Sequence, residues 1–370
     1  MIKNIYSAPS PSNSLVEVLE RNTLAFLGAL HTAFLISFLV AAALGASTLG
    51  ASAQDIARCE GINLWEDLQK RDAAAAALIK SQADETVYGN ARLFKLEKDG
   101  VAPSYLFGTM HLTDPRVTNL TPAAADAIYA TQTVAIETTD ILDEAAVQAK
   151  LLSQPELSMF IDGTRLSDFM DDEQRQIVED GLAERGMRLA LVDRMKPWLI
   201  SGMLALPACE NERKASGSQV LDAQIAVLAQ NTGKELVGLE TLEEQLGAMA
   251  SLPMEQHIDG LVETLQMGDQ INDALETMIQ LYLAGDISTI WPVLRHLALE
   301  MSGEEVQPDE NHRRFEEVLI DARNKTMFDR SLALLEQGGA FIAVGALHLP
   351  GELGLAKLFA EAGFKITAIE

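Results

Sequence analysis

Ser104-Tyr-Leu-Phe-Gly-Thr-Met-His111 is a short apolar run that ends in Gly-x-x-His. Near the other end of the chain, Ala340-Phe-Ile-Ala-Val-Gly-Ala-Leu-His348 has the same form. Both runs predict buried strands, and the glycine three residues before each histidine leaves room for the backbone to approach closely. Sites in open α/β sheets form at the carboxyl ends of strands, so both histidines are candidates for one site.

Two further buried strands are predicted between these stretches, at residues 133–136 and 236–239. They end at Glu137 and Glu240, so four predicted strands end in a side chain that can bind a metal or carry a proton. Strands that alternate with helical segments predict an α/β fold with a mixed sheet flanked by helices.

The segment 91–107 reads as an antiparallel hairpin, because two apolar runs flank the turn signal Asp99-Gly100. A 3.6-residue apolar period predicts helices in the segments 54–90, 141–230 and 254–300. Most of the chain between Glu137 and the last core strands is therefore expected to be a large helical insertion, at about 141–310.

The composition excludes some partners. Acidic residues outnumber basic ones by 54 to 28, and the formal net charge is −26. Such a surface repels nucleic acid and anionic lipid, so neither is expected as a partner. The sequence contains no HExxH, no GxSxG, no Walker A motif and no GxGxxG after a strand, which argues against a zincin, a serine hydrolase and a nucleotide-binding protein.

The N-terminal 53 residues differ from the rest of the chain. Leu24 to Ala53 carries no charged residue and ends in Ala-Ser-Ala, a pattern that a signal peptidase could cut. The same run is long enough to span a bilayer, so residues 1–53 are interpreted as a signal peptide or an N-terminal membrane anchor. With either segment, the domain expected at 54–370 is exported to the periplasm, where it is free or anchored in the inner membrane. Contact with the membrane is expected only through residues 1–53.

The chain has two cysteines, Cys59 and Cys209. In an oxidising compartment they could form a disulfide, and the alternative is a pair of buried free thiols.

The residues at the four strand ends suit a metal site. Two neutral imidazoles with carboxylates favour Zn, Mn, Fe or Co over Mg or Ca, and such a metal can lower the pKa of water and polarise a carbonyl. The alternative is that His111 and His348 are ordinary core histidines and that Glu137 and Glu240 are acids at helix N-termini.

The pair Arg323-Asn324 is a further candidate, since asparagine is a poor residue in mid-helix. The pair could hold a substrate or an oxyanion, or form a surface salt bridge beside a local bend.

Several motifs, in order along the chain, resemble those of the TraB/GumN family, which is related to the Tiki metalloproteases. They are Ser104–Leu112 with Asp114-Pro115-Arg116, Val134–Glu137, Lys196-Pro197-Trp198, Leu221-Asp222, Gly233–Glu235, Gly238–Thr241 with Gln245, Arg323-Asn324 with Met327, and Val344–Gly351. The resemblance runs from about Cys59 to the C-terminus, and the ordered set is far more specific than either Gly-x-x-His alone.

The resemblance implies a Tiki-like α/β fold, of the type called Tiki/EreA/ChaN-like, in which the two Gly-x-x-His motifs meet at one divalent metal. It carries over His111 and His348 as metal ligands and Glu137 as a ligand or a general base. It also implies that Glu240 is a further metal ligand, that Arg323 and Asn324 are supporting polar residues in catalysis, and that Cys59 pairs with Cys209, as in a bacterial subgroup.

The activity that follows is a metal-dependent hydrolase, with a peptidase as the more specific expectation and a peptide or an envelope-derived molecule as substrate. Two alternatives remain open. One is a periplasmic protein that binds or sequesters such a ligand without turning it over, and the other is an accessory protein of envelope polysaccharide assembly.

Overall fold

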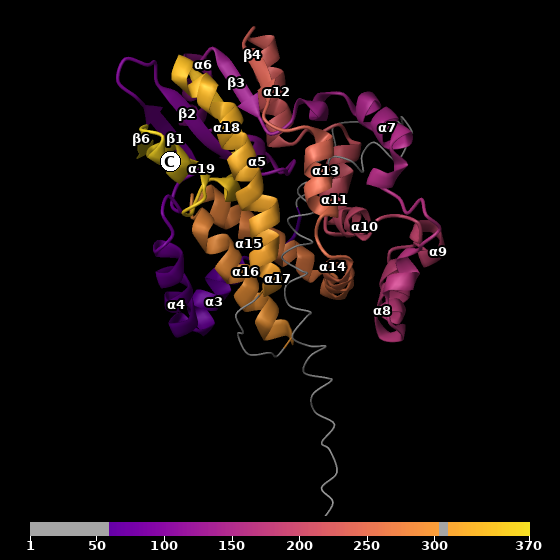
Figure 1. The fold of residues 1–370 in the computed structure, drawn as a ribbon. Coiled ribbons are helices and arrows are strands. Elements are labelled where there is room, and N and C mark those ends of the chain that lie inside the picture. Colours follow the sequence, from indigo (N-terminus) through magenta and orange to yellow (C-terminus); the bar gives the residue numbers. More distant parts are fainter. Residues whose placement is uncertain (1–58, 303–309) are drawn as a thin grey trace, which may run out of the picture.

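The computed structural model describes residues 59–302 and 310–370, so the predicted signal peptide or anchor at 1–53 lies outside the described residues. A six-stranded sheet forms the centre, in the order β4-β3-β5-β2-β1-β6 (Figure 1). The strands are β1 (Leu93–Glu97), β2 (Ser104–Thr109), β3 (Thr133–Ile136), β4 (Glu235–Gly238), β5 (Ala340–Gly345) and β6 (Lys365–Ala368). The predicted α/β fold with a mixed sheet is confirmed.

Four neighbouring strands are parallel. β3 pairs with β4 and with β5, and β5 pairs with β2, all in the parallel sense. The hairpin partner β1 runs antiparallel to β2, as the turn at Asp99-Gly100 predicts, and β6 pairs antiparallel on its other side. In the β2–β5 register, Gly108 lies opposite Val344 and Thr109 lies opposite Gly345, so the two Gly-x-x-His motifs begin side by side.

Helices cover both faces of the sheet, and the strands divide their side chains between two cores. Phe107 of β2 and Phe341 of β5 point into a core with helices α6 (Pro122–Ala130), α12 (Leu221–Asn231), α15 (Gln270–Leu283) and α16 (Ile287–Ser302). Leu106 and Ile342 point the other way, into a core with α18 (Ala322–Gln337) and α19 (Leu355–Glu361). Figure 1 shows α18 as a long helix that passes across the sheet. This alternation is the two-residue period of a strand that is buried on both sides.

Most of the chain between β3 and β5 is helical, and it includes β4. Its helical elements are η1 (Thr139–Leu142), α7 (Glu144–Ser153), η2 (Pro155–Leu157), η3 (Leu166–Phe169), α8 (Asp172–Glu184), α9 (Leu189–Val192), α10 (Pro197–Leu204), α11 (Ala208–Ala215), α12, α13 (Leu242–Ala250), α14 (Met254–Met267), α15, α16, α17 (Glu310–Glu316), the π-helical turn η4 (Glu317–Asp321) and α18. Two apolar clusters beside the sheet join α8 and α10 to α14, and α7 to α13.

The helices predicted as long runs are divided. The helix predicted at 254–300 is divided into three helices, α14, α15 and α16. The divisions lie at Gly268 and Gly285, whose φ angles are positive, at 50° and 72°. Glycine adopts this conformation readily, and it ends an α-helix. The predicted helix at 54–90 is α3 (Leu64–Arg71) and α4 (Ala73–Asp84) in its described part. Asp72 separates these two, and its carboxylate caps α4 by accepting from the backbone N–H of Ala74 and Ala75.

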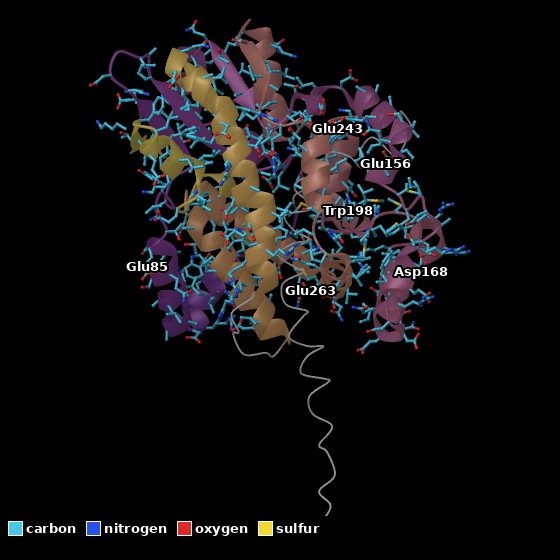
Figure 2. All side chains as sticks on the ribbon, in the orientation of Figure 1. Glu85, Glu156, Asp168, Trp198, Glu243 and Glu263 are labelled. Carbon is cyan, nitrogen blue, oxygen red and sulfur yellow. A yellow bond between two sulfur atoms is a disulfide. The ribbon has the colours of Figure 1, made fainter. Side chains whose placement is uncertain are left out.

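The predicted disulfide is present. Cys59 and Cys209 are bonded, with their Cα atoms 5.4 Å apart, and they join the segment before α3 to helix α11. Acidic residues are spread over the surface: Glu85, Glu156 and Asp168 are exposed on separate elements, as Figure 2 shows. In the part of the chain that the structure describes, no helix combines the length and the apolar character needed to cross a membrane.

Candidate metal centre

The four residues predicted at strand ends lie along one edge of the sheet. Each follows the carboxyl end of one of the four parallel strands, so the strand order sets their order along the edge as Glu240, Glu137, His348, His111. The carboxyl edge of a parallel sheet is where α/β proteins build their sites.

His111 is held by a buried acid. Its Nδ1 lies 2.7 Å from Oδ2 of Asp222, and the other carboxylate oxygen of Asp222 accepts the hydroxyl proton of Thr109 at 2.6 Å. Asp222 lies in the first turn of α12 and is 3% exposed. The carboxylate can only accept, so Nδ1 of a neutral His111 carries the proton and the Nε2 lone pair points into the site.

His348 is held in the same way by an amide. Asn324 Nδ2 donates to the carbonyl of Leu353 at 2.9 Å, which leaves Oδ1 to accept from His348 Nδ1 at 2.7 Å. The proton of a neutral His348 is therefore on Nδ1, and Nε2 again offers its lone pair. Asn324 is fully buried, and both polar atoms of its side chain are engaged inside the protein. This position supports a role in orienting His348 and leaves the amide no atom for a substrate.

Both histidines face the same oxygen. His111 Nε2 lies 3.8 Å from Glu137 Oε1, and His348 Nε2 lies 3.9 Å from it. The same oxygen accepts the backbone N–H of Gly345 at 2.7 Å. A Cβ at Gly345 would stand 3.1 Å from Glu137 Oε1 and 3.7 Å from His111 Nε2, so glycine keeps open the space that the three side chains surround.

Glu240 has a different position from the other three. Its two carboxylate oxygens bind the buried guanidinium of Arg323, at 2.6 Å from Nη2 and 3.0 Å from Nε. Arg323 Nη2 also donates to Glu137 Oε2 at 2.7 Å, and Gln245 donates to that oxygen at 3.2 Å. Among the described contacts, none joins Glu240 to either histidine, so Glu240 is placed to hold Arg323, which in turn holds Glu137.

The charges around the site favour a cation beside His111. Burial alone would lower the pKa of His111, but the Asp222 and Glu137 carboxylates outweigh it and raise this pKa to about 10. Burial alone would raise the pKa of Glu137, but Arg323, His111 and His348 hold it well below its usual range. Glu137 is therefore a permanent carboxylate, and the positive charge that it favours can be a proton or a metal ion.

The residues present fit a divalent metal in donor chemistry. Two imidazole nitrogens and one carboxylate oxygen are the ligands that Zn, Mn, Fe and Co accept, and each imidazole has the outer partner that metal-binding histidines typically have. Ligands of such metals lie about 2.0–2.2 Å from the ion, so they stand roughly 3.3–3.6 Å apart in a tetrahedron. The separations of 3.8 and 3.9 Å are slightly wider. In the segments 59–302 and 310–370, no group of three or more His, Cys, Asp or Glu side chains is already at metal-binding distances.

A cavity opens next to these groups. Its polar lining is Thr109, His111, Glu137 and His348, and its other lining residues are Met110, Met278, Tyr282, Ile290, Gly345, Ala346 and Leu347. A molecule in this cavity would lie against both histidines and Glu137.

The roles of three residues of this site were not predicted from the sequence. Asp222 and Gln245 lie near the starts of α12 and α13, where an acid or an amide is common. Tyr282 lies at core spacing in α15 and donates its hydroxyl proton to the carbonyl of Gly108 at 2.9 Å. The ordered motifs Leu221-Asp222 and Glu240-Thr241 with Gln245 were the available signal for the first two, and Tyr282 had none.

Comparison with known proteins gives one family. The family model described as TraB/PrgY/gumN matches residues 92–368, about three quarters of the chain. Three relatives are named metalloproteases. Metalloprotease TIKI1 of Xenopus tropicalis is 25% identical and covers 80% of this chain, Metalloprotease TIKI2 of the same species is 24% identical over 83%, and human Metalloprotease TIKI1 is 24% identical over 75%.

The chain spans less than two thirds of the length of these relatives, at 64%, 65% and 61% in the same order. No solved structure matches the chain at a significant level. All four strands that lead to the candidate site lie within the part that the family model matches.

Proposed function

Because the chain belongs to the TraB/PrgY/gumN family, distantly related to the TIKI metalloproteases, we propose that it is a metal-dependent hydrolase that cleaves peptides. The observation that carries the proposal is the convergence of His111 Nε2 and His348 Nε2 on Glu137 Oε1. The relatives are named metalloproteases, which supports the metal and the reaction class.

In this proposal, His111, His348 and Glu137 hold the metal. When bound, the metal supplies a Lewis acid that polarises a substrate carbonyl and lowers the pKa of water. Asp222 and Asn324 fix the Nδ1 protons, so each imidazole presents Nε2 to the site without a tautomer change.

Glu137 serves as a ligand and not as the general base. Its oxygens already accept from Gly345, Gln245 and Arg323, and its low pKa makes it a weak proton acceptor near neutral pH. Arg323 acts through Glu137, because its guanidinium is 4% exposed and is shared between Glu137 and Glu240. It positions the ligand and does not touch the substrate.

We place the activity outside the cytoplasm. The disulfide between Cys59 and Cys209 supports this, because such bonds persist in oxidising compartments. The substrate would then be an extracytoplasmic or envelope-derived peptide.

The experiment incubates the full-length chain with a defined peptide mixture and separate additions of Zn²⁺, Mn²⁺, Co²⁺ or Fe²⁺, and it identifies products by mass spectrometry. New termini are expected with at least one metal, and they should be absent with His111→Ala or His348→Ala. The matched control is His296→Ala, which removes a partly buried histidine of α16 outside the cavity and should keep activity. Full activity in both site variants would overturn the proposal, and intact peptides that nevertheless bind would favour the sequestering protein.

A further inference from the structure

One wall of the cavity beside the two histidines is apolar. It is formed by Met110, Met278, Tyr282, Ile290, Ala346 and Leu347. These residues come from the end of β2, from the consecutive helices α15 and α16, and from the turn η5 (Ala346–His348), so the wall is built by three separate parts of the sequence. Helices α15 and α16 lie next to each other beneath the sheet in Figure 1.

The wall offers a ligand almost no polar atom. The hydroxyl of Tyr282 is used by the carbonyl of Gly108, and the guanidinium of Arg92 lies 5.0 Å from the centre of its ring. Tyr282 is 1% exposed and is fixed from two sides. The titratable groups that line the same cavity are His111, Glu137 and His348.

We infer that this wall is a specificity subsite that binds the apolar side chain of a substrate residue next to the cleaved bond. The inference rests on the proposed hydrolase function and names its substrate class, a linear peptide with Leu, Met or Phe at that position. The cavity borders the candidate ligands directly, so a side chain on the wall belongs to a residue adjacent to the reacting carbonyl.

Two features define what the subsite accepts. Met110 and Met278 are unbranched and adapt their shape, so Leu, Met and Phe are accepted with similar efficiency. A charged or strongly polar side chain would lose its water against this wall without gaining a hydrogen bond. The net charge of −26 adds a preference against acidic residues elsewhere in the peptide.

The test compares two peptides that differ only at the residue next to the cleaved bond, Leu in one and Ser in the other. The cleavage position comes first from a peptide library digested by the full chain with Zn²⁺ or Mn²⁺. We expect kcat/KM to be roughly 10- to 100-fold higher for the Leu peptide.

Met278→Gln places an amide in the wall with little change in shape, and it should reduce the Leu-to-Ser ratio about tenfold. Met267→Gln is the matched control, since Met267 is equally buried, at 6% against 4% exposed, and does not line the cavity. It should leave the ratio unchanged even if it lowers stability, because a ratio of two substrates does not depend on the amount of folded enzyme. A wild-type ratio near one, or a ratio that Met278→Gln leaves intact, would overturn the subsite.

Failure of the proposed function gives a different result. If no peptide is cleaved, two fluorescently labelled peptides that differ only in Leu or Ser at their central position are titrated against the full chain. A tenfold tighter Kd for the Leu peptide that Met278→Gln abolishes supports the subsite in a protein without hydrolytic activity. Equal affinity of both peptides overturns the subsite as well.

Discussion

Asn324 Oδ1 accepts the Nδ1 proton of His348 at 2.7 Å, and this contact fixes which nitrogen of the histidine faces the candidate metal centre. Asn324→Ala should therefore lower metal affinity about 10- to 100-fold, the usual effect of removing an outer partner of a metal-binding histidine. The loss of two buried hydrogen bonds should also cost about 1–3 kcal/mol of unfolding free energy. Metal affinity is measured by competition with a chelating dye, and Asn231→Ala, at an exposed asparagine, is the control. Unchanged affinity in a folded Asn324→Ala protein would remove this role.

Gly345→Ala tests the space between the ligands. The backbone of Gly345 has φ −51° and ψ 135°, which alanine adopts without strain. The new methyl would lie 3.1 Å from Glu137 Oε1 and 3.4 Å from His348 Cδ2. We expect strongly reduced metal uptake with a melting temperature close to that of the wild type. Gly247→Ala has open space around its Cβ and should keep full uptake; equal uptake by both variants would contradict the proposed position of the metal.

Arg323→Met tests the buried ion network. Removing the guanidinium leaves Glu240 without its cation, while Glu137 still faces His111 and His348; the loss should cost about 3–5 kcal/mol of unfolding free energy. Burial already raises the pKa of Glu240, and without Arg323 this pKa rises further above the unfolded value, so the folded variant holds a proton that the unfolded chain loses and gains stability relative to the wild type as the pH falls. Urea unfolding at pH 8 and pH 5.5 should show the larger deficit at pH 8.

The control for this variant is Arg330→Met, which removes an exposed pair with Glu244 and should cost under about 1 kcal/mol at either pH. A deficit for Arg323→Met that is small, or equal at both pH values, would mean that the Glu240 carboxylate does not depend on Arg323.

His257 sets a pH dependence outside the site. Burial is the largest cause that lowers its pKa to about 4, and its Nε2 lies 3.0 Å from the carbonyl of Met249. The unfolded value is about 6.5, so the unfolded chain binds more protons between these values and stability falls as the pH drops from 6.5 to 4. The loss from this residue is about 3 kcal/mol. His257→Gln should show a shallower acid dependence in urea unfolding, and a slope equal to that of the wild type would contradict the assignment.

The sequence was sufficient for the strands, the hairpin and the residues at the strand ends, because these follow from local apolar patterns and turn chemistry. His111, Glu137, Glu240 and His348 each follow a predicted strand directly. The order of the strands along the sheet does not follow from local patterns. It is the position of β5 between β3 and β2 that places His348 and Glu137 next to each other.

Local sequence patterns also could not predict which side chains hold the residues of the site. Asp222 is 111 positions from His111, and Glu240 is 83 positions from Arg323, so only the folded chain joins them. Arg323 explains why Glu240 is not a neighbour of the histidines: the guanidinium occupies the side of Glu240 that faces Glu137. The division of the helix predicted at 254–300 was missed because a single glycine inside an apolar period does not reveal a positive φ angle, and the division of the helix predicted at 54–90 was missed because the capping role of Asp72 depends on its backbone conformation.

The most direct test is the metal content of the full-length chain, purified without a histidine tag or chelator and measured by elemental mass spectrometry. His111→Ala/His348→Ala is measured beside it, with circular dichroism to confirm folding. We predict close to one Zn, Mn, Fe or Co ion per wild-type chain and none in the folded double variant. Wild-type protein that takes up none of these metals after supplementation, or a double variant that keeps a full equivalent, would contradict the metal centre.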